Sequence, residues 1–259
     1  TTKKSPPAGQ IFMSDAIQIK NLSFGYKESA HTLINNLNLS IRQGDRFGIF
    51  GPNGAGKTTL MHLMTGLLPY DQGSVQLLGH EMKNHRKKLN RCFGVVPQDF
   101  SFYGELSPVE NLDFFGAWAG LSRQQIRSKT DELLQIMSLT AVRDKPVHKF
   151  SGGMKRRVNL AIGVIHDPQI LFLDEPTVGV DIQTRYAIIA YLKKLNEKGT
   201  TLVYTSHHLK EAEDLCHTIA MIDEGNILVN DTLETLLKTH RQDGLEGLFL
   251  DLTGRAYRD

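Results

Sequence analysis

The sequence predicts an α/β fold in which a mostly parallel sheet carries an inserted helical lobe. Short apolar segments typical of strands alternate with helical segments at both ends of the chain. A glycine-rich loop stands between one such strand and a helix, and residues 100–165 hold helical patterns. With 259 residues, of which 40% are hydrophobic, the chain is long enough for one large domain with lobes.

Strand patterns dominate the first hundred residues. Residues 1–15 are polar and lack periodicity, so we expect a flexible N-terminal tail there. Gly44 marks a turn between two strands, and the spacing after the glycine-rich loop predicts a helix over residues 57–68. The segments with strand patterns are 16–24, 32–41, 45–50, 73–78 and 92–96.

Three capped helices are predicted in the lobe. Ser107 offers an N-cap, followed by proline at the first helical position and by the capping-box residue Glu110. Ser122 precedes a helical pattern that runs to about Leu139, and Ser151 precedes a third helix. We therefore expect a helical subdomain over about residues 100–165.

The second half of the chain returns to alternating strands and helices. Residues 170–173 and 201–205 are continuous apolar runs, typical of strands buried on both faces. Asp181 is suited to cap the helix between them, and residues 220–229 predict a hairpin. From residue 241 to 259 we expect only a short C-terminal tail.

The glycine-rich loop matches the G-x-x-x-x-G-K-[ST] pattern of a phosphate-binding loop. Its glycines let successive N–H groups point at phosphate oxygens, and the following helix adds the positive end of its dipole. We assign Lys57 to the β- and γ-phosphates of a nucleotide and the Thr58 hydroxyl to Mg²⁺. The predicted nucleotide-binding residues of the loop are Gly51, Pro52, Asn53, Gly54, Ala55, Gly56, Lys57, Thr58 and Thr59.

A pair of acidic residues follows the buried strand at residues 170–173. Asp174 stands where a carboxylate holds Mg²⁺, usually through the water shell of the ion. Glu175 is the next residue and can polarise an attacking water as a general base. Together with the phosphate loop, the pair predicts a nucleotide-hydrolysing site.

Further motifs make the chain resemble the ATP-binding subunit of ABC transporters, over roughly residues 16–240. Val95-Val-Pro-Gln-Asp99 is similar to the Q-loop of that family, and Phe150-Ser-Gly-Gly-Met154 stands where its signature motif stands. Pro176-Thr-Val-Gly-Val-Asp181 follows as the D-loop, and Thr205-Ser-His207 looks like the switch-histidine segment. The residues that carry these similarities are Gln98, Ser151, Gly152, Gly153, Asp181 and His207, together with Tyr26, where the family stacks an aromatic ring on adenine.

The resemblance implies a P-loop NTPase core with a mostly parallel sheet, an antiparallel β subdomain and an inserted helical subdomain. It implies ATP and Mg²⁺ as cofactors, with Thr58, Gln98 and Asp174 directed at the metal. Catalytic roles fall to Glu175, to Gln98 at the γ-phosphate, and to His207, which would bind the γ-phosphate and orient Glu175.

The resemblance also implies a homodimer. In that family two subunits pair head to tail, and the signature of one clamps the γ-phosphate held by the other. Residues 151–153 would then contact the nucleotide of a second copy of this chain, and Asp181 would contact that copy, cap its own helix, or do both. Phe150 and Met154 replace the usual leucine and glutamine of the signature, and we expect this to alter the packing of the lobe more than the chemistry.

The overall composition and charge of the chain indicate its partners and its location in the cell. A net charge of +2 gives no large basic field, so we expect no nucleic-acid partner. We find no run of 18 apolar residues and no secretory signal, and Cys92 and Cys216 suit a reducing compartment, so we expect a soluble, intracellular chain. The resemblance then implies integral membrane permease subunits as partners, with the chain at the cytoplasmic face of the inner membrane, peripheral through the permease.

The direction of transport is predicted from the end of the chain. Residues 245–254 and the Gly-Met pair of the signature look like those of multidrug-type exporters, so we expect export, with residues 100–120 as an aromatic docking surface for the permease. The ATPase of an importer and a non-transport ABC ATPase remain alternatives. A chromosome or DNA-repair ATPase needs a long coiled-coil insertion, for which 259 residues leave no room. A translation factor of this superfamily needs two cassettes, and we find one. We therefore expect neither of these functions. The substrate is not encoded in these residues.

Overall fold

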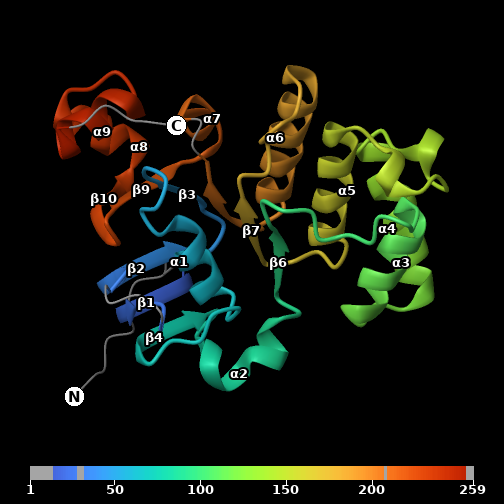
Figure 1. The fold of residues 1–259 in the computed structure, drawn as a ribbon, viewed down its shortest axis with the longest axis horizontal. Helices are drawn as coiled ribbons and strands as arrows, with labels where there is room; N and C mark the ends of the chain where they lie inside the picture. Colours follow the sequence, from blue (N-terminus) through green and yellow to red (C-terminus); the bar gives the residue numbers. More distant parts are fainter. Residues whose placement is uncertain (1–13, 28–31, 207–208, 255–259) are drawn as a thin grey trace, which may run out of the picture.

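The computed structural model describes residues 14–27, 32–206 and 209–254 and shows two sheets with a helical lobe on one side (Figure 1). The strands are β1 (Asp15–Phe24), β2 (Ile34–Arg42), β3 (Arg46–Phe50), β4 (Gln72–Leu77), β5 (His80–Glu81), β6 (Phe93–Val96), β7 (Ile170–Asp174), β8 (Thr201–Thr205), β9 (Thr218–Asp223) and β10 (Asn226–Thr232). The α-helices are α1 (Lys57–Met64), α2 (Met82–Leu89), α3 (Pro108–Trp118), α4 (Arg123–Ile136), α5 (Gly152–Val164), α6 (Ile182–Glu197), α7 (Leu209–Leu215), α8 (Leu233–His240) and α9 (Leu245–Thr253), with short 3₁₀ turns at Thr140–Val142 and Val147–Lys149.

The larger sheet confirms the predicted mostly parallel arrangement. Its six strands have the order β10-β9-β3-β8-β7-β6, and only β10 runs antiparallel to its neighbour. Strands β3, β8 and β7 are adjacent and parallel, so their carboxyl ends meet at one edge of the sheet. The phosphate loop follows β3 and the acidic pair stands at the end of β7, which brings the two predicted halves of the site to that same edge.

Both faces of this sheet are covered, which explains the continuous apolar runs. In β7, Ile170 and Phe172 lie in a core cluster shared with α1 and the smaller sheet. Leu171 and Leu173, on the opposite face, lie in a second cluster shared with α5 and α6. Strand side chains alternate between faces, so a strand that is buried on both sides is apolar at consecutive positions.

The smaller sheet is the antiparallel β subdomain that the resemblance implies. Its four strands have the order β2-β1-β4-β5, and Ile17 of β1 pairs with Ile41 of β2 on one side and Leu77 of β4 on the other. Figure 1 shows this subdomain beside α1, at the opposite end of the molecule from α3 and α4. Its inner residues complete the core under the phosphate loop.

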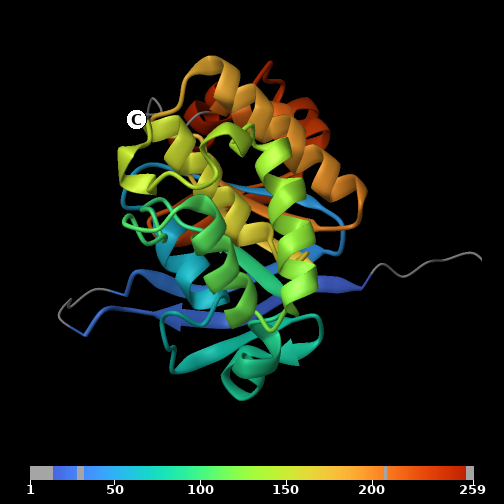
Figure 2. The ribbon, with the colours of Figure 1, turned by 90° about the vertical axis from the view of Figure 1, so that its right-hand side faces the viewer.

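The helical subdomain contains the three predicted helices, α3, α4 and α5, and Figure 2 shows α3 and α4 in front. Ser107 and Glu110 form the predicted capping box, because the Glu110 amide donates to the Ser107 hydroxyl and the Glu110 carboxylate accepts from the Ser107 amide. Ser122 caps α4 in the same way with Gln125, and Ser151 caps α5. The serine caps therefore predicted the starts of these three helices correctly.

The ends of the chain differ from the prediction. The C-terminal tail expected over 241–259 instead contains helix α9, whose Leu245, Leu248 and Phe249 are buried in the core against α7 and α8. Their spacing of three and four residues forms one helical face, and burying that face stabilises the segment that we expected to be a tail. At the other end, Asp15 already belongs to β1 and pairs with Arg42 of β2. Residues 1–13 of the predicted N-terminal tail lie outside the described residues.

Three further helices, α2, α7 and α8, are absent from the prediction, and α1 ends at Met64, four residues earlier than expected. Helix α2 buries only Met82 and Leu89 and is otherwise basic and polar, so it carries no clear apolar periodicity. Within the described part of the chain, no helix has the length and apolarity that crossing a bilayer requires.

The packing of α9 can be tested with two neighbouring residues. Phe249 is 3% exposed and Leu250 is 50% exposed. We expect Phe249→Ala to lower the free energy of unfolding by about 3 kcal/mol, because it leaves a cavity in the core. Leu250→Ala is the matched control and should change stability by less than about 0.5 kcal/mol. Equal effects in urea denaturation would show that α9 does not pack as described.

Candidate active site

The phosphate loop connects the central strand β3 to α1 and depends on glycine at three positions. Gly54 and Gly56 have φ angles of 84° and 103°, in the left-handed region that side chains disfavour. A Cβ on Gly51 would lie 1.9 Å from the carbonyl oxygen of Ile222, so no side chain fits there. The loop can therefore curl tightly and direct backbone amides at an anion.

Lys57 lies inside this loop and is only 7% exposed. Its Nζ donates to the carbonyl oxygens of Gly51 at 2.8 Å and Pro52 at 3.1 Å. Burial lowers the pKa of Lys57, while the nearby charges of Glu175 and Asp174 act in the opposite direction. The ammonium group is thus held on the inner side of the loop, at the positive end of the α1 dipole.

Asp174 ends the buried strand β7 and is 5% exposed. Thr205, at the end of the adjacent strand β8, donates a hydrogen bond of 2.5 Å from its Oγ1 to Asp174 Oδ1. Their positions are paired in the strand register, which places the hydroxyl beside the carboxylate. This contact holds Asp174 in one orientation and leaves Oδ2 as a further acceptor.

Glu175 has a φ of 49°, which is uncommon for a residue other than glycine and marks a strained turn. Its amide donates to the carbonyl oxygen of Thr205 at 3.1 Å, and its side chain lies beside Gln98, whose Nε2 donates to Glu175 Oε2 at 2.9 Å. The structure thus joins two predicted catalytic residues that are 77 positions apart in the sequence.

The oxygen atoms at this edge of the sheet are suitable ligands for a hard divalent cation. Asp174 supplies a carboxylate, Thr58 an exposed hydroxyl on the first turn of α1, and Gln98 an amide oxygen opposite the NH₂ that binds Glu175. Mg²⁺ is usually held by one or two carboxylates together with substrate phosphates. One carboxylate with two neutral oxygens fits a Mg²⁺ ion that also binds nucleotide phosphates. Among the residues that the structure describes, no group of three or more His, Cys, Asp or Glu side chains could hold a metal.

Two residues of α5 that the sequence analysis did not select hold the loop that carries Gln98. Arg156 donates from Nη1 to the carbonyl oxygens of Pro97 at 3.2 Å and Gln98 at 2.9 Å. Asn159 is fully buried, donates to the carbonyl oxygen of Pro97, and accepts from the amide and hydroxyl of Ser101. Asn159, a polar residue within the apolar stretch of the predicted helix, was the available signal, because buried polar side chains need specific partners.

The signature residues cap α5 at a different place from the phosphate loop. Ser151 accepts from the amide of Met154, and both Ser151 and Gly152 are exposed. Side chains built on Gly152 and Gly153 would find Gly179, Asp181 and Thr184 as their nearest neighbours. The first turn of α5 contains no acidic residue, and the start of the helix is open to solvent at Ser151 and Gly152.

Asp181 caps α6, as predicted. It accepts from the amide of Thr184 at 2.9 Å and from the Thr184 hydroxyl at 2.7 Å. The Thr184 hydroxyl and then the Thr184 amide lower the pKa of Asp181, so the carboxylate stays charged beside the signature.

Tyr26 lies next to the phosphate loop, and His207 cannot be placed. The Tyr26 hydroxyl shares a hydrogen bond of 3.1 Å with Thr59 Oγ1, and the ring is 45% exposed. An exposed ring in this position is available for stacking. The prediction for His207 falls outside the described residues.

Comparison with known sequences gives one consistent result. A sequence model of the ABC transporter family matches residues 34–178. The linearmycin resistance ATP-binding protein LnrL of Bacillus subtilis is 38% identical over 216 residues, covering 83% of this chain and 69% of that protein. The Nod factor export ATP-binding protein I of Ralstonia nicotianae is 37% identical over 222 residues, covering 86% of this chain and 68% of that protein.

Solved structures agree with these sequence relatives. An ATP-binding subunit of an ABC transporter superposes with a TM-score of 0.85 at 25% identity, covering 92% of this chain and 99% of that one. A dimeric ATP-binding cassette in a post-hydrolysis state bound to ADP and Pi gives a TM-score of 0.77 at 27% identity, covering 84% of this chain and 98% of that one.

The role of Arg156 can be tested with a neutral side chain of similar length. We expect Arg156→Met to leave ATP affinity nearly unchanged but to lower kcat by about ten- to a hundredfold, because Gln98 and Glu175 lose their fixed geometry. Lys155→Met is the control, since the Lys155 side chain makes no hydrogen bond or ion pair with the described part of the chain. An unchanged kcat in Arg156→Met would rule out this positioning role.

Proposed function

This chain belongs to the ABC transporter family, and on that premise we propose that it powers export of a substrate through a separate membrane permease. As a member of the family it is an ATP-binding subunit that hydrolyses ATP. We propose that it does so with Mg²⁺, as a homodimer closed around ATP, at the cytoplasmic face of the membrane. The permease would hold it there.

The observation that carries the hydrolytic mechanism is the placement of Glu175. Glu175 is 7% exposed and stands one residue beyond the metal-directed Asp174, and its carboxylate accepts a hydrogen bond from Gln98. A carboxylate held in this way can accept a proton from a water that attacks the γ-phosphate. Gln98 would orient that carboxylate and its water and would respond to the γ-phosphate.

Phosphoryl transfer depends mainly on positioning and on charge stabilisation. The loop amides and Lys57 would bind the β- and γ-phosphates and offset the charge that develops during transfer. Mg²⁺, held by Thr58, Gln98 and Asp174, would neutralise phosphate charge when bound. Tyr26 would stack on the adenine, and His207 would contact the γ-phosphate and orient Glu175.

The exposed start of α5 supports a composite active site. Ser151 and the amides of Gly152 and Gly153 are accessible at the start of α5, while the phosphate loop of the same chain already supplies a phosphate site. A second copy arranged head to tail would place its γ-phosphate against this helix start. Asp181, ionised beside the signature, would contact that copy.

An aromatic surface on the helical subdomain supports a membrane partner. Phe100, Tyr103, Phe114 and Trp118 are 43, 51, 46 and 76% exposed. Tyr103 and Phe114 are in contact edge to face, with ring centroids 5.0 Å apart. Exposed aromatic groups of this kind are typical of protein interfaces, so we assign this surface to the permease.

The names of two relatives support export. The Ralstonia protein is named for Nod factor export, and the Bacillus protein for linearmycin resistance. Neither name assigns a substrate to this chain.

Glu175→Gln tests the general base. We expect ATP binding to persist and hydrolysis to fall by at least about a hundredfold, because the amide cannot accept the proton. The variant should accumulate as an ATP-bound dimer in size-exclusion chromatography, whereas the wild type should return to monomers after turnover. Glu213→Gln, a substitution away from the site, is the control. Hydrolysis at the wild-type rate by Glu175→Gln would contradict the assignment.

A further inference from the structure

Helix α2 and the residues that follow it form a basic surface that plays no part in the ATP site. Residues 83–91 contain no aspartate or glutamate, although the whole chain has a net charge of only +2. We call their exposed cations the α2 basic surface. It consists of Lys83, Arg86, Lys87, Lys88 and Arg91.

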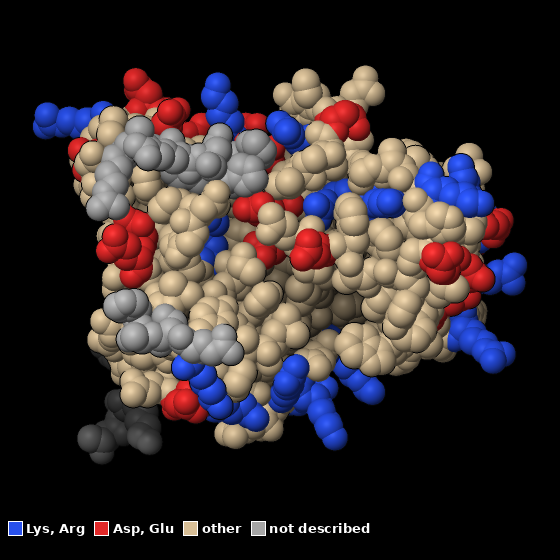
Figure 3. Space-filling view, viewed as in Figure 1, with Lys and Arg blue, Asp and Glu red and all other residues tan. Residues whose placement is uncertain are grey.

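The packing of α2 explains why these cations face outward. Met82 and Leu89 are the buried residues of the helix, and they lie seven positions apart, on one stripe that packs toward β4. The remaining side chains therefore point away from the core. Figure 3 shows Lys and Arg side chains gathered over α2, along the lower edge of the molecule.

The charge of the α2 basic surface is not neutralised by its neighbours. None of its cations forms an ion pair with a carboxylate that the structure describes. Lys83 lies over the ring of Tyr70, and Lys88 Nζ lies 3.0 Å from His80 Nε2, so neither contact supplies a formal negative charge. The preceding carboxylate, Glu81, accepts a hydrogen bond of 2.6 Å from the Tyr70 hydroxyl.

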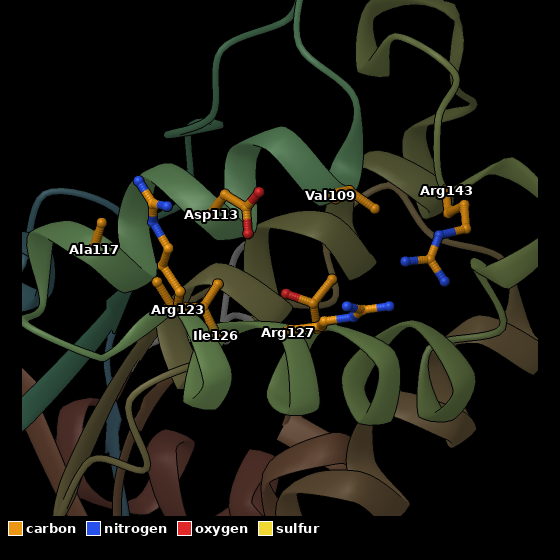
Figure 4. A pocket seen from close by; sticks show the side chains of 8 residues that line it. Val109, Asp113, Ala117, Arg123, Ile126, Arg127 and Arg143 are labelled. Carbon is orange, nitrogen blue, oxygen red and sulfur yellow. The ribbon is translucent and has the colours of Figure 1, made fainter.

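Cations of the helical subdomain differ in this respect. Arg143 pairs with Asp131 at 3.0 Å, and Lys129 pairs with Asp167 at 2.7 Å. Figure 4 shows Asp113 among the arginines that line the groove between α3 and α4. Opposite charges are thus interspersed there, whereas the α2 basic surface carries one sign of charge.

The cations of the α2 basic surface are close enough to act together. Nine helical residues span roughly 12 Å, which is comparable with the Debye length of about 8 Å at physiological ionic strength. Clusters of roughly four to eight lysines and arginines on a helix are typical of surfaces that bind anionic lipids. A single-stranded nucleic acid would also need aromatic rings among the cations for its bases to stack on, and residues 83–91 contain no Phe, Trp or Tyr.

An exposed tryptophan stands close to this surface. A Cβ built on Gly120 would lie 3.6 Å from Cζ of Arg91, so the Arg91 guanidinium lies beside the end of α3. Trp118, two residues before Gly120, is 76% exposed. The indole ring has an apolar body and a polar N–H group, and tryptophan is enriched at the interface between membrane and water.

We propose that the α2 basic surface binds the anionic lipid headgroups of the membrane, with Trp118 beside it at the membrane–water interface. This inference rests on the proposed location at the membrane and adds a direct lipid contact to the contact with the permease. One electrostatic contact gives weak and reversible binding, so the permease is still required for stable attachment.

Cosedimentation of the full chain with vesicles at low salt tests the proposal. We expect binding when about a third of the lipid is phosphatidylglycerol and the rest phosphatidylcholine, and no binding to phosphatidylcholine alone, because the attraction is electrostatic. High salt should release the protein. Trp118 is the only tryptophan of the sequence, so its fluorescence should shift to shorter wavelength when the protein binds.

A triple variant removes three cations of the α2 basic surface. Arg86→Gln with Lys87→Gln and Lys88→Gln should weaken vesicle binding by about a hundredfold, since each cation near an anionic membrane contributes to the affinity. The ATPase rate in solution, without vesicles, should not change.

The matched control removes the same charge from the other side of the molecule. Lys194, Lys198 and Lys210 are exposed on α6 and α7, which Figure 1 shows on the opposite side from α2. Their triple substitution by Gln should leave vesicle binding near the wild-type level, because these residues lie away from the lipid.

Four results would each overturn the proposal. They are no binding of the wild type to anionic vesicles, binding without a shift in Trp118 fluorescence, equal losses in the two triple variants, and tighter binding to hexaglutamate or to a short oligonucleotide than to the vesicles at equal anionic charge. Because the vesicles contain no permease, such a failure is distinct from a failure of the proposed transport function, which the solution ATPase rate and the Glu175→Gln variant test separately.

Discussion

The hydrogen bonds made by Thr205 hold the acidic residues of this site in place. Its hydroxyl binds Asp174 and its carbonyl oxygen accepts from the Glu175 amide, so one residue of β8 fixes both a metal-directed carboxylate and the strained turn that follows it. This works only because β7 and β8 are adjacent, parallel and in register at their carboxyl ends. The backbone strain at Glu175 persists because the surrounding strands determine it.

The same edge of the sheet is connected to the helical subdomain through α5. Arg156 and Asn159 bind the backbone around Gln98, and Ser151 caps the start of the same helix. A change at the γ-phosphate that moves Gln98 can therefore be transmitted to the helix whose first turn would contact the second copy. The polar residues that form this connection are almost fully buried, where unpaired groups are costly, so the connection favours one geometry.

Local patterns in the sequence were sufficient for the elements that carry phosphate chemistry. The glycine spacing predicted the loop, and serine caps predicted the starts of α3, α4 and α5. Contacts between distant segments could not be predicted in this way. The pairing of Gln98 with Glu175 was not specified by spacing, and α9 was mistaken for a tail because its apolar face matters only once α7 and α8 are present. Arg156 looked like one of several basic residues at a helix start until its burial was known.

In the proposed dimer, each ATP is hydrolysed between the phosphate loop of one copy and the signature of the other. Mixing two inactive variants, Lys57→Ala and Ser151→Arg, measures this most directly. A mixed dimer holds one intact composite site, so random pairing should restore about a quarter of the wild-type ATPase rate, if the two sites act independently. Each variant alone should stay inactive. A mixture that is as inactive as its components, or a Ser151→Arg protein that is active alone, would contradict the claim.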